Sequence, residues 1–193
     1  IAILTFCITP VARLKAQPTQ PNPAYNQAKP SNIITNSNLS MPPISVGAEN
    51  TAAYWSIIRN QRVGIVANPT SKIGNVHLID TLKSRGLNIT GVFAPEHGFR
   101  GEAANGDKVL NSIDPKTKIQ IVSLYGKSIK PTKKDLSDVD IVVFDIQDVG
   151  VRFYTYLTTL HYVMEACAEN NKQLIVFDRP NPNGYYVDGP ILE

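Results

Sequence analysis

Residues 140–150 read DIVVFDIQDVG, a short apolar run followed by an amide and two acids. The run is rich in β-branched residues and bounded by polar ones, which predicts a short strand. An almost continuous apolar strand is typical of a parallel sheet that is buried on both faces. The polar residues at the end of this run are therefore expected at the carboxyl edge of such a sheet.

The same pattern repeats along the chain from Ala48 onward. We predict strands in the runs RVGIVAN, NITGVFA, IQIVSL, DIVVFD and QLIVFD, at residues 62–68, 88–94, 119–124, 140–145 and 173–178. We predict helices over residues 48–60, 75–86 and 156–171, the second of them ending at Gly86. This alternation indicates an α/β fold, a Rossmann-like parallel sheet with helices on both faces.

Polar side chains recur directly after the predicted strands. In open α/β sheets, ligands bind in the crevice outside the carboxyl ends of the strands, so these side chains are expected to converge on one pocket. A general preference of loops for polar residues would account for Asn68 and Asp178. It accounts less well for the whole set, which is Asn68, Glu96, His97, Tyr125, Asp145, Gln147, Asp148, Asp178 and Arg179.

Size and charge narrow the class of protein. The chain has 193 residues, of which 42% are hydrophobic and 18% charged, enough for one domain with a substantial core. The net charge of +3 comes without a basic run or a nucleic-acid-binding motif. We therefore expect no nucleic-acid partner.

The first 47 residues differ in composition from the rest. Residues 1–16 open with an apolar run and end in small residues, which predicts a partial signal peptide and export to the periplasm or the extracellular space. The run is shorter than the roughly 20 residues that span a bilayer, so no integral membrane segment is expected in the mature chain. Lipidation at Cys7 is the less favoured alternative, because the bulky Phe6 precedes it. Residues 17–47 are rich in Pro, Asn, Gln and Ser, which predicts a disordered linker before a domain over 48–193.

No cofactor or metal site is expected. The turn after the first strand, NPTSKIGN, lacks the glycine fingerprint of a dinucleotide site, and GEAANGDK at 101–108 resembles a phosphate loop only loosely. The three histidines, His77, His97 and His161, lie on separate elements instead of at metal-ligand spacing. We predict that His77 and His161 lie on helices, with packing or surface roles.

The stretch APEHGFRG at 94–101 points to carboxylate chemistry. Glu96 lies in a loop bounded by Pro95 and Gly98 and could act as a general acid. With a second acid from Asp145 or Asp148, it would form the carboxyl pair of glycoside hydrolysis. An ion pair between Glu96 and Arg100 that only holds the loop is an equally good interpretation of the spacing.

Four motifs in a fixed order resemble the NamZ-type exo-β-N-acetylmuramidases from about Arg62 to Glu193. They are VFAPEHGFRGEAANGDKV, VSLYGKSIKPT, VVFDIQDVGVRFYTYLTTL and VFDRPNPNGYYVDGPILE. The resemblance implies an exported glycosidase of cell-wall recycling that releases N-acetylmuramic acid from the non-reducing ends of peptidoglycan fragments. It also implies that the C-terminal domain of the family is missing here, so that 48–193 would be a catalytic Rossmann-like domain truncated at its C-terminal side.

The resemblance also implies roles for individual residues. Glu96 is the leading catalytic candidate, with His97 and Asp148 beside it, although the second catalytic group is left open. The expected substrate-binding residues are Asn68, Arg100, Tyr125, Asp145, Gln147, Arg152, Tyr154, Asp178 and Arg179. An arginine is expected to bind the lactyl carboxylate of muramic acid, with Arg152 and Arg100 ranked before Arg179. The alternative function is a non-catalytic peptidoglycan- or sugar-binding protein on the same fold.

Overall fold

The computed structural model describes residues 4–6, 44–101, 111–185, 187 and 189. Its helices are α1 (Thr51–Ile58), α2 (Leu78–Ser84) and α3 (Tyr156–Glu169), with a short 3-10 helix η1 (Gly47–Glu49) before α1. Its strands are β1 (Leu4–Phe6), β2 (Val63–Ala67), β3 (Lys72–Ile73), β4 (Val76–His77), β5 (Ile89–Ala94), β6 (Ser112–Ile113), β7 (Gln120–Ser123), β8 (Ile141–Asp145) and β9 (Gln173–Val176). Every predicted strand and helix has a counterpart here.

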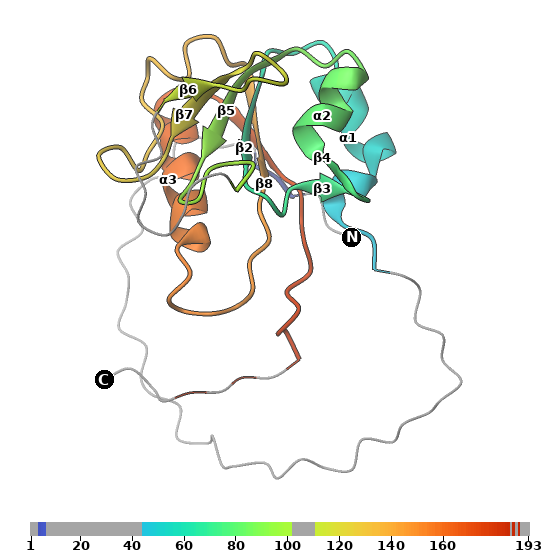
Figure 1. Cartoon of the computed structure of the whole chain (residues 1–193), viewed down its shortest axis with the longest axis vertical. Helices are drawn as coiled ribbons and strands as arrows, with labels where there is room; N and C mark the ends of the chain where they lie inside the picture. The colour runs from blue at the N-terminus through green and yellow to red at the C-terminus, as the bar shows by residue number, and fades with distance from the viewer. Residues whose placement is uncertain (1–3, 7–43, 102–110, 186, 188, 190–193) are drawn as a thin grey trace. The chain divides into compact units, whose positions relative to one another are not determined.

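The main sheet has the order β1-β9-β8-β2-β5-β7-β6, and most of it is visible in Figure 1. The five strands from β9 to β7 run parallel, while β1 and β6 pair antiparallel at the two edges. The chain starts this parallel sheet at β2, extends it to β5 and β7, and then returns to the other side of β2 with β8 and β9. The topological switch point, where ligands bind in such sheets, therefore lies between β2 and β8.

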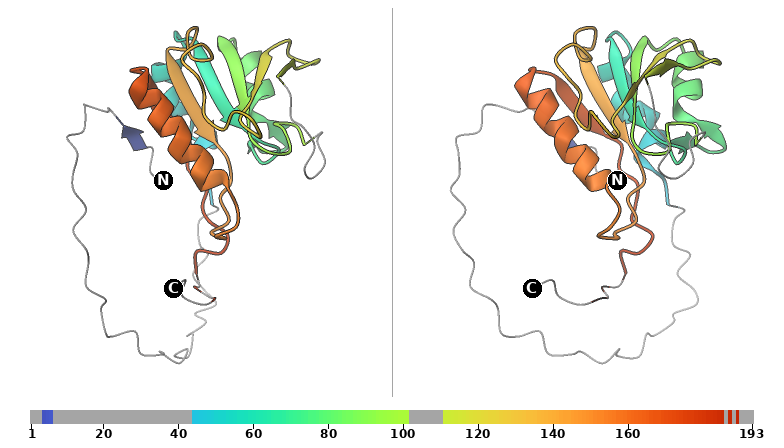
Figure 2. Two further views of the ribbon diagram at one scale, coloured as in Figure 1. Left: turned by 90° about the vertical axis from the view of Figure 1, so that its left-hand side faces the viewer. Right: turned by 60° about the vertical axis from the view of Figure 1, so that its left-hand side comes forward.

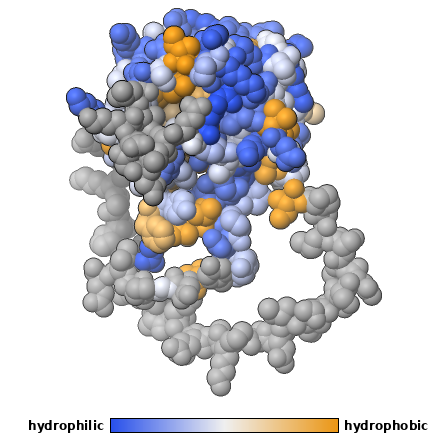
Figure 3. All heavy atoms as spheres, in the orientation of Figure 1, coloured by the Kyte–Doolittle hydropathy of each residue, from blue (hydrophilic) through white to orange (hydrophobic). Residues whose placement is uncertain are grey.

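Helices cover both faces of the sheet, as predicted (Figures 1 and 2). In β2, Ile65 and Ala67 join the apolar cluster under α1 and α2, whereas Val66 between them joins the cluster under α3. This alternation follows from the pleat of a strand, whose successive side chains point to opposite faces. All five residues of β2 and all five of β8 are buried, which explains their almost continuous apolar sequence. The outer face shown in Figure 3 is mostly hydrophilic, with apolar side chains in small groups.

The structure corrects the start of the second predicted helix. The helix predicted from residue 75 begins at Leu78, because residues 72–77 form the small hairpin β3–β4. Gly74 and Asn75 are its two-residue turn, and Gly74 has the positive φ of 56° that such turns require. His77 was predicted to be helical, but it is the last residue of β4 and the N-cap of α2. The Gly-Asn pair between two apolar residues was the signal for this hairpin.

Only part of the N-terminal 47 residues is described. Within the predicted signal peptide, Leu4–Phe6 forms β1, which pairs antiparallel with β9, and Cys7 lies outside the described residues. Within the predicted linker, only residues 44–47 are described, and Gly47 is already buried in η1. Its N–H donates to the carbonyl of Asp178 at 2.6 Å, so the packed structure begins before Ala48. In the part of the chain that the structure describes, no helix is long and apolar enough to cross a membrane.

Gly47 provides a test of this start. A Cβ at residue 47 would lie 2.6 Å from the backbone nitrogen of Asp178 and 3.0 Å from the backbone of Phe177. Since main-chain atoms cannot rotate away, we expect Gly47→Ala to lower the free energy of unfolding by about 1–3 kcal/mol in urea titrations. Gly91→Ala is the matched control, because a Cβ there meets nothing within 4 Å. Equal stability of the two variants would contradict the packing of η1 against the end of β9.

Candidate functional site

A buried ion pair lies at the switch point of the sheet. Asp145, the last residue of β8, has no exposed surface, and both of its carboxylate oxygens accept hydrogen bonds from Arg179 at 2.6 and 2.9 Å. Arg179 also donates to the carbonyl of Lys72 at 2.8 Å. Burial raises the pKa of the Asp145 carboxyl, and the guanidinium opposes this effect. The pair thus joins the loops after β8 and β9 to the β3–β4 hairpin.

Short polar contacts hold the loop after β2 against the loop after β8. The side-chain oxygen of Asn68 accepts from the backbone N–H of Thr70 at 2.9 Å, which closes the turn. Ser71 is fully buried, and its hydroxyl donates to the carbonyl of Asp145. The hydroxyl of Thr70 accepts from the backbone N–H of Gln147 at 3.1 Å. The amide of Gln147 in turn donates to the carbonyl of Pro180 at 3.0 Å. Asn68 and Gln147 therefore hold the loops at the switch point through their own hydrogen bonds.

Glu96 lies in the loop that follows β5, at the same edge of the sheet. Its side chain is half-buried, and its carboxylate shifts the pKa of Tyr125, which lies in the loop after β7. As a hydrogen-bond acceptor first, and through its charge second, Glu96 raises the pKa of Tyr125. His97 and Gly98 both have φ of 71°, a left-handed conformation that is uncommon for a histidine. Such backbone is found where surrounding contacts fix a loop, often at functional sites.

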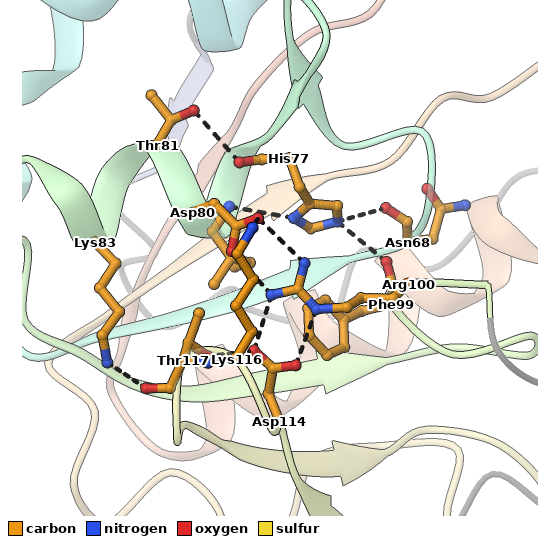
Figure 4. Close-up of polar contacts among 11 residues, drawn as sticks. Asn68, His77, Asp80, Thr81, Lys83, Phe99, Arg100, Asp114, Lys116 and Thr117 are labelled. Carbon is orange, nitrogen blue, oxygen red and sulfur yellow. Dashed lines mark hydrogen bonds and ion pairs between the residues drawn. The ribbon is translucent and has the colours of Figure 1, made fainter.

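Arg100, near the end of this loop, is bound by two carboxylates (Figure 4). Its guanidinium donates to Asp114 at 2.8 and 2.9 Å and to Asp80 of α2 at 2.9 and 3.2 Å. Lys116 adds a bond to Asp80 at 2.7 Å, and the guanidinium stacks 4.7 Å from the ring centre of Phe99. The ion pairs of Arg100 are thus with Asp80 and Asp114. The ion pair between Glu96 and Arg100, which the sequence spacing suggested, was wrong. We call Arg100, Asp80 and Asp114 the arginine cluster.

The remaining predicted residues lie around the same edge. Asp148 is half-exposed after β8, and its carboxylate accepts the N–H of Gly150 at 3.2 Å. Arg152 and Tyr154 follow it and are exposed, as is Asp178 after β9. The structure therefore separates the three candidate arginines. Arg100 and Arg179 are bound to carboxylates that are at least 88% buried, while Arg152 is exposed on the loop before α3.

Sequence analysis missed three residues that hold the Glu96 loop. Asp80 and Asp114 come from α2 and from the turn before β7, and only the tertiary fold brings them to Arg100. His77 was assigned a packing or surface role, yet its ring contacts the loops after both β2 and β5. No spacing in the sequence indicated these contacts, because the partners lie 9 to 22 residues apart.

Metal ligands do not gather here. Within the described ranges, no three His, Cys, Asp or Glu side chains form a group that could hold a metal ion. That the site works without a cofactor or a metal ion remains a prediction from the sequence. GEAANGDK, at 101–108, lies outside the described residues except for Gly101.

The fold and this edge define a Rossmann-like α/β domain whose switch point carries carboxylates and arginines. The family model for the N-terminal part of exo-β-N-acetylmuramidase NamZ matches residues 63–193, so the chain belongs to the NamZ family. Over 164 residues it is 43% identical to the peptidoglycan β-N-acetylmuramidase NamZ of Bacillus subtilis, covering 82% of this chain and 39% of that protein.

Two solved structures of DUF1343 family proteins from Bacteroides fragilis are similar to the chain. One is 46% identical with a TM-score of 0.66, over 77% of this chain and 38% of the other. The second is 39% identical with a TM-score of 0.67, over 79% of this chain and 39% of the other. The chain thus spans well under half the length of the relatives it matches.

The arginine cluster makes stability depend on pH. Burial alone would raise the pKa of Asp114, but hydrogen bonds from Arg100 and Thr117 outweigh it, and this pKa lies well below its usual range. Its stabilising contribution is therefore complete above the unfolded pKa of about 3.9 and is lost as the pH falls through the folded value. We expect Asp114→Asn to lower the free energy of unfolding by about 1.5–3 kcal/mol at neutral pH, with the difference narrowing below about pH 4.

Urea unfolding of both proteins between pH 2 and 7 measures this difference. Asp138→Asn is the control, because Asp138 is 84% exposed and pairs with Arg62 only at 3.4 Å. Its effect should stay within about 0.5 kcal/mol. A difference for Asp114→Asn that is constant across the whole pH range would show that the charge of Asp114 does not stabilise the fold.

Proposed function

We propose that the full-length protein is an exo-β-N-acetylmuramidase that releases N-acetylmuramic acid from the non-reducing ends of peptidoglycan fragments. Family membership supports this activity, since the Bacillus subtilis relative is named for it. The observation that carries the proposal is the position of Glu96, half-buried in the loop at the carboxyl end of the buried strand β5, where it raises the pKa of Tyr125. Export of the protein is a further proposal, supported by the sequence of residues 1–16 alone.

Glu96 is the proposed general acid. In its protonated form it would donate to the glycosidic oxygen as the bond to the anomeric carbon breaks. The Tyr125 hydroxyl would then hold the carboxylate that this transfer leaves behind. His97, next in the chain, is proposed to line the same site.

Asp148 is the proposed second carboxylate. The other candidate, Asp145, is fully buried and has both oxygens bonded to Arg179, so a substrate could not reach it without breaking that pair. Asp148 is half-exposed and lies three residues after Asp145, in the loop that follows β8. In an inverting enzyme it would activate water, and in a retaining enzyme it would attack the sugar.

Replacing the acid tests the proposal directly. Glu96→Gln keeps the shape and a hydrogen-bonding group but removes the transferable proton, so kcat on a chromogenic N-acetylmuramic acid glycoside should fall by roughly 10²- to 10⁴-fold. The thermal midpoint of unfolding should change little. Tyr125→Phe, which keeps the acid, should lower kcat by a smaller factor. If Glu96→Gln keeps the kcat of the wild type, Glu96 is not the acid. If the wild-type protein binds the sugar without cleaving it, a sugar-binding role is favoured.

Arg152 is the proposed group for the lactyl carboxylate that distinguishes muramic acid from glucosamine. A guanidinium can bind a carboxylate with two parallel hydrogen bonds, and Arg152 is exposed to solvent in the loop that follows β8. We expect Arg152→Ala to lower kcat/KM for the muramic acid glycoside by the equivalent of about 1.5–3 kcal/mol. Activity on an N-acetylglucosaminide should be unchanged, so the selectivity narrows.

Lys133→Ala is the control for Arg152, because Lys133 is an exposed cation in the loop between β7 and β8. It should leave both kcat/KM values as they are. Equal losses on the two glycosides in Arg152→Ala would assign Arg152 a general role in the site, and no loss would place recognition of the carboxylate elsewhere.

A further inference from the structure

His77 links the loop after β2, which borders the switch point, to the loop after β5 (Figure 4). Its Nε2 atom lies 3.1 Å from the carbonyl oxygen of Asn68, after β2, and 3.0 Å from the carbonyl oxygen of Phe99, in the Glu96 loop. Its Nδ1 atom accepts the backbone N–H of Ile79 at 3.3 Å, at the first turn of α2. One side chain thus contacts three separate segments of the domain.

These contacts define the tautomer of the ring. Because Nδ1 is an acceptor, we assign the proton to Nε2, where the N–H is shared between the two carbonyl oxygens. Burial is the main cause that lowers the pKa of His77, and the nearby Arg100 lowers it further, while the two carbonyls and Asp80 raise it. The neutral ring can make all three contacts at once. A protonated ring could not accept from Ile79.

The Glu96 loop is held on both sides of its acid. On the N-terminal side it continues directly from Ala94, the last residue of the buried strand β5, and Gly98 donates back to the carbonyl of Pro95 at 3.1 Å. On the C-terminal side, His77 holds the backbone of Phe99, and the edge of its ring packs on the buried Phe99 ring at 5.4 Å between centroids. The two left-handed residues lie between these attachments, so the direction of the Glu96 side chain depends on both.

We propose that His77 is a positioning residue that holds the loop of Glu96 at the geometry needed for proton transfer, through the hydrogen bond from its Nε2 to Phe99. This inference rests on the proposed function of Glu96. His77 acts on Glu96 through the backbone of the loop, by its contact with the carbonyl of Phe99. Its effect is expected in kcat rather than in KM, because misplacing a reacting group by about 1 Å can cost on the order of 10²-fold in rate.

Two substitutions separate positioning from helix capping. In His77→Asn, the short side chain can still cap α2, since Asn is among the best N-caps, but it is too short to reach the two carbonyls. In His77→Gln, the terminal NH₂ extends to about the position of Nε2 and has two hydrogens for the two carbonyls, but Gln is a poor N-cap. The two variants therefore each keep one function of the histidine and lose the other.

The experiment compares both variants in the full-length protein, with His161→Asn and His161→Gln on the exposed face of α3 as controls. We expect His77→Asn to lower kcat on the muramic acid glycoside by about 10- to 100-fold with KM changed less than about 3-fold. His77→Gln should retain most of the activity while its thermal midpoint falls by about 2–4 °C. The His161 variants should match wild type.

Hydrogen exchange provides a readout that needs no activity. Amides of residues 96–101 should exchange faster in His77→Asn than in wild type, and at about the wild-type rate in His77→Gln. If wild type cleaves no glycoside but the exchange rates behave in this way, the proposed function fails and the positioning of the loop stands. If wild type is active and His77→Asn has wild-type kcat and wild-type exchange, the positioning role is wrong. Equal losses of kcat in both variants would also overturn it, because they would trace the effect to the ring and not to its Nε2 bonds.

Discussion

The bond between Asp145 and Arg179 is the constraint on which the carboxyl edge of the sheet depends. Asp145 ends β8 with no exposed surface, so its charge is tolerated only because Arg179 binds both oxygens. That bond fixes the loop after β9 against the loop after β8, and Ser71 attaches the loop after β2 to the same point. Removing either partner would leave a buried charge without compensation, which is far costlier than losing an exposed pair.

The domain uses charge in two ways at one edge. Pairs that are closed off from water, at Asp145 and in the arginine cluster, define where the loops lie. The more accessible side chains at that edge include Glu96, Asp148 and Arg152, to which we assign chemistry and recognition. An active carboxylate needs a rigid support, since proton transfer tolerates little error in distance. We propose that His77 and the ion pairs of Arg100 provide that support for Glu96.

The sequence was sufficient for the five parallel strands but not for the edge strands β1 and β6, nor for the contacts at the carboxyl edge of the sheet. Runs such as VGIVA and IVVFD predicted buried strands, and their alternation with the helices predicted the parallel sheet. Partners within the site are set by the tertiary fold. Spacing suggested Glu96 as a partner of Arg100, whereas Arg100 binds Asp80 and Asp114, and Arg179 binds the distant Asp145. The bridging histidine, His77, had no sequence signal beyond the Gly-Asn turn before it.

The central claim is that Glu96 delivers a proton to the glycosidic oxygen of an N-acetylmuramic acid residue. A crystal structure of the full-length Glu96→Gln variant with a disaccharide of N-acetylmuramic acid and N-acetylglucosamine tests it most directly. The account predicts the residue 96 amide within about 2.6–3.2 Å of the bridging oxygen. It also predicts the lactyl carboxylate beside Arg152. A bridging oxygen next to Asp148 instead, with residue 96 pointing away from the sugar, would contradict the account.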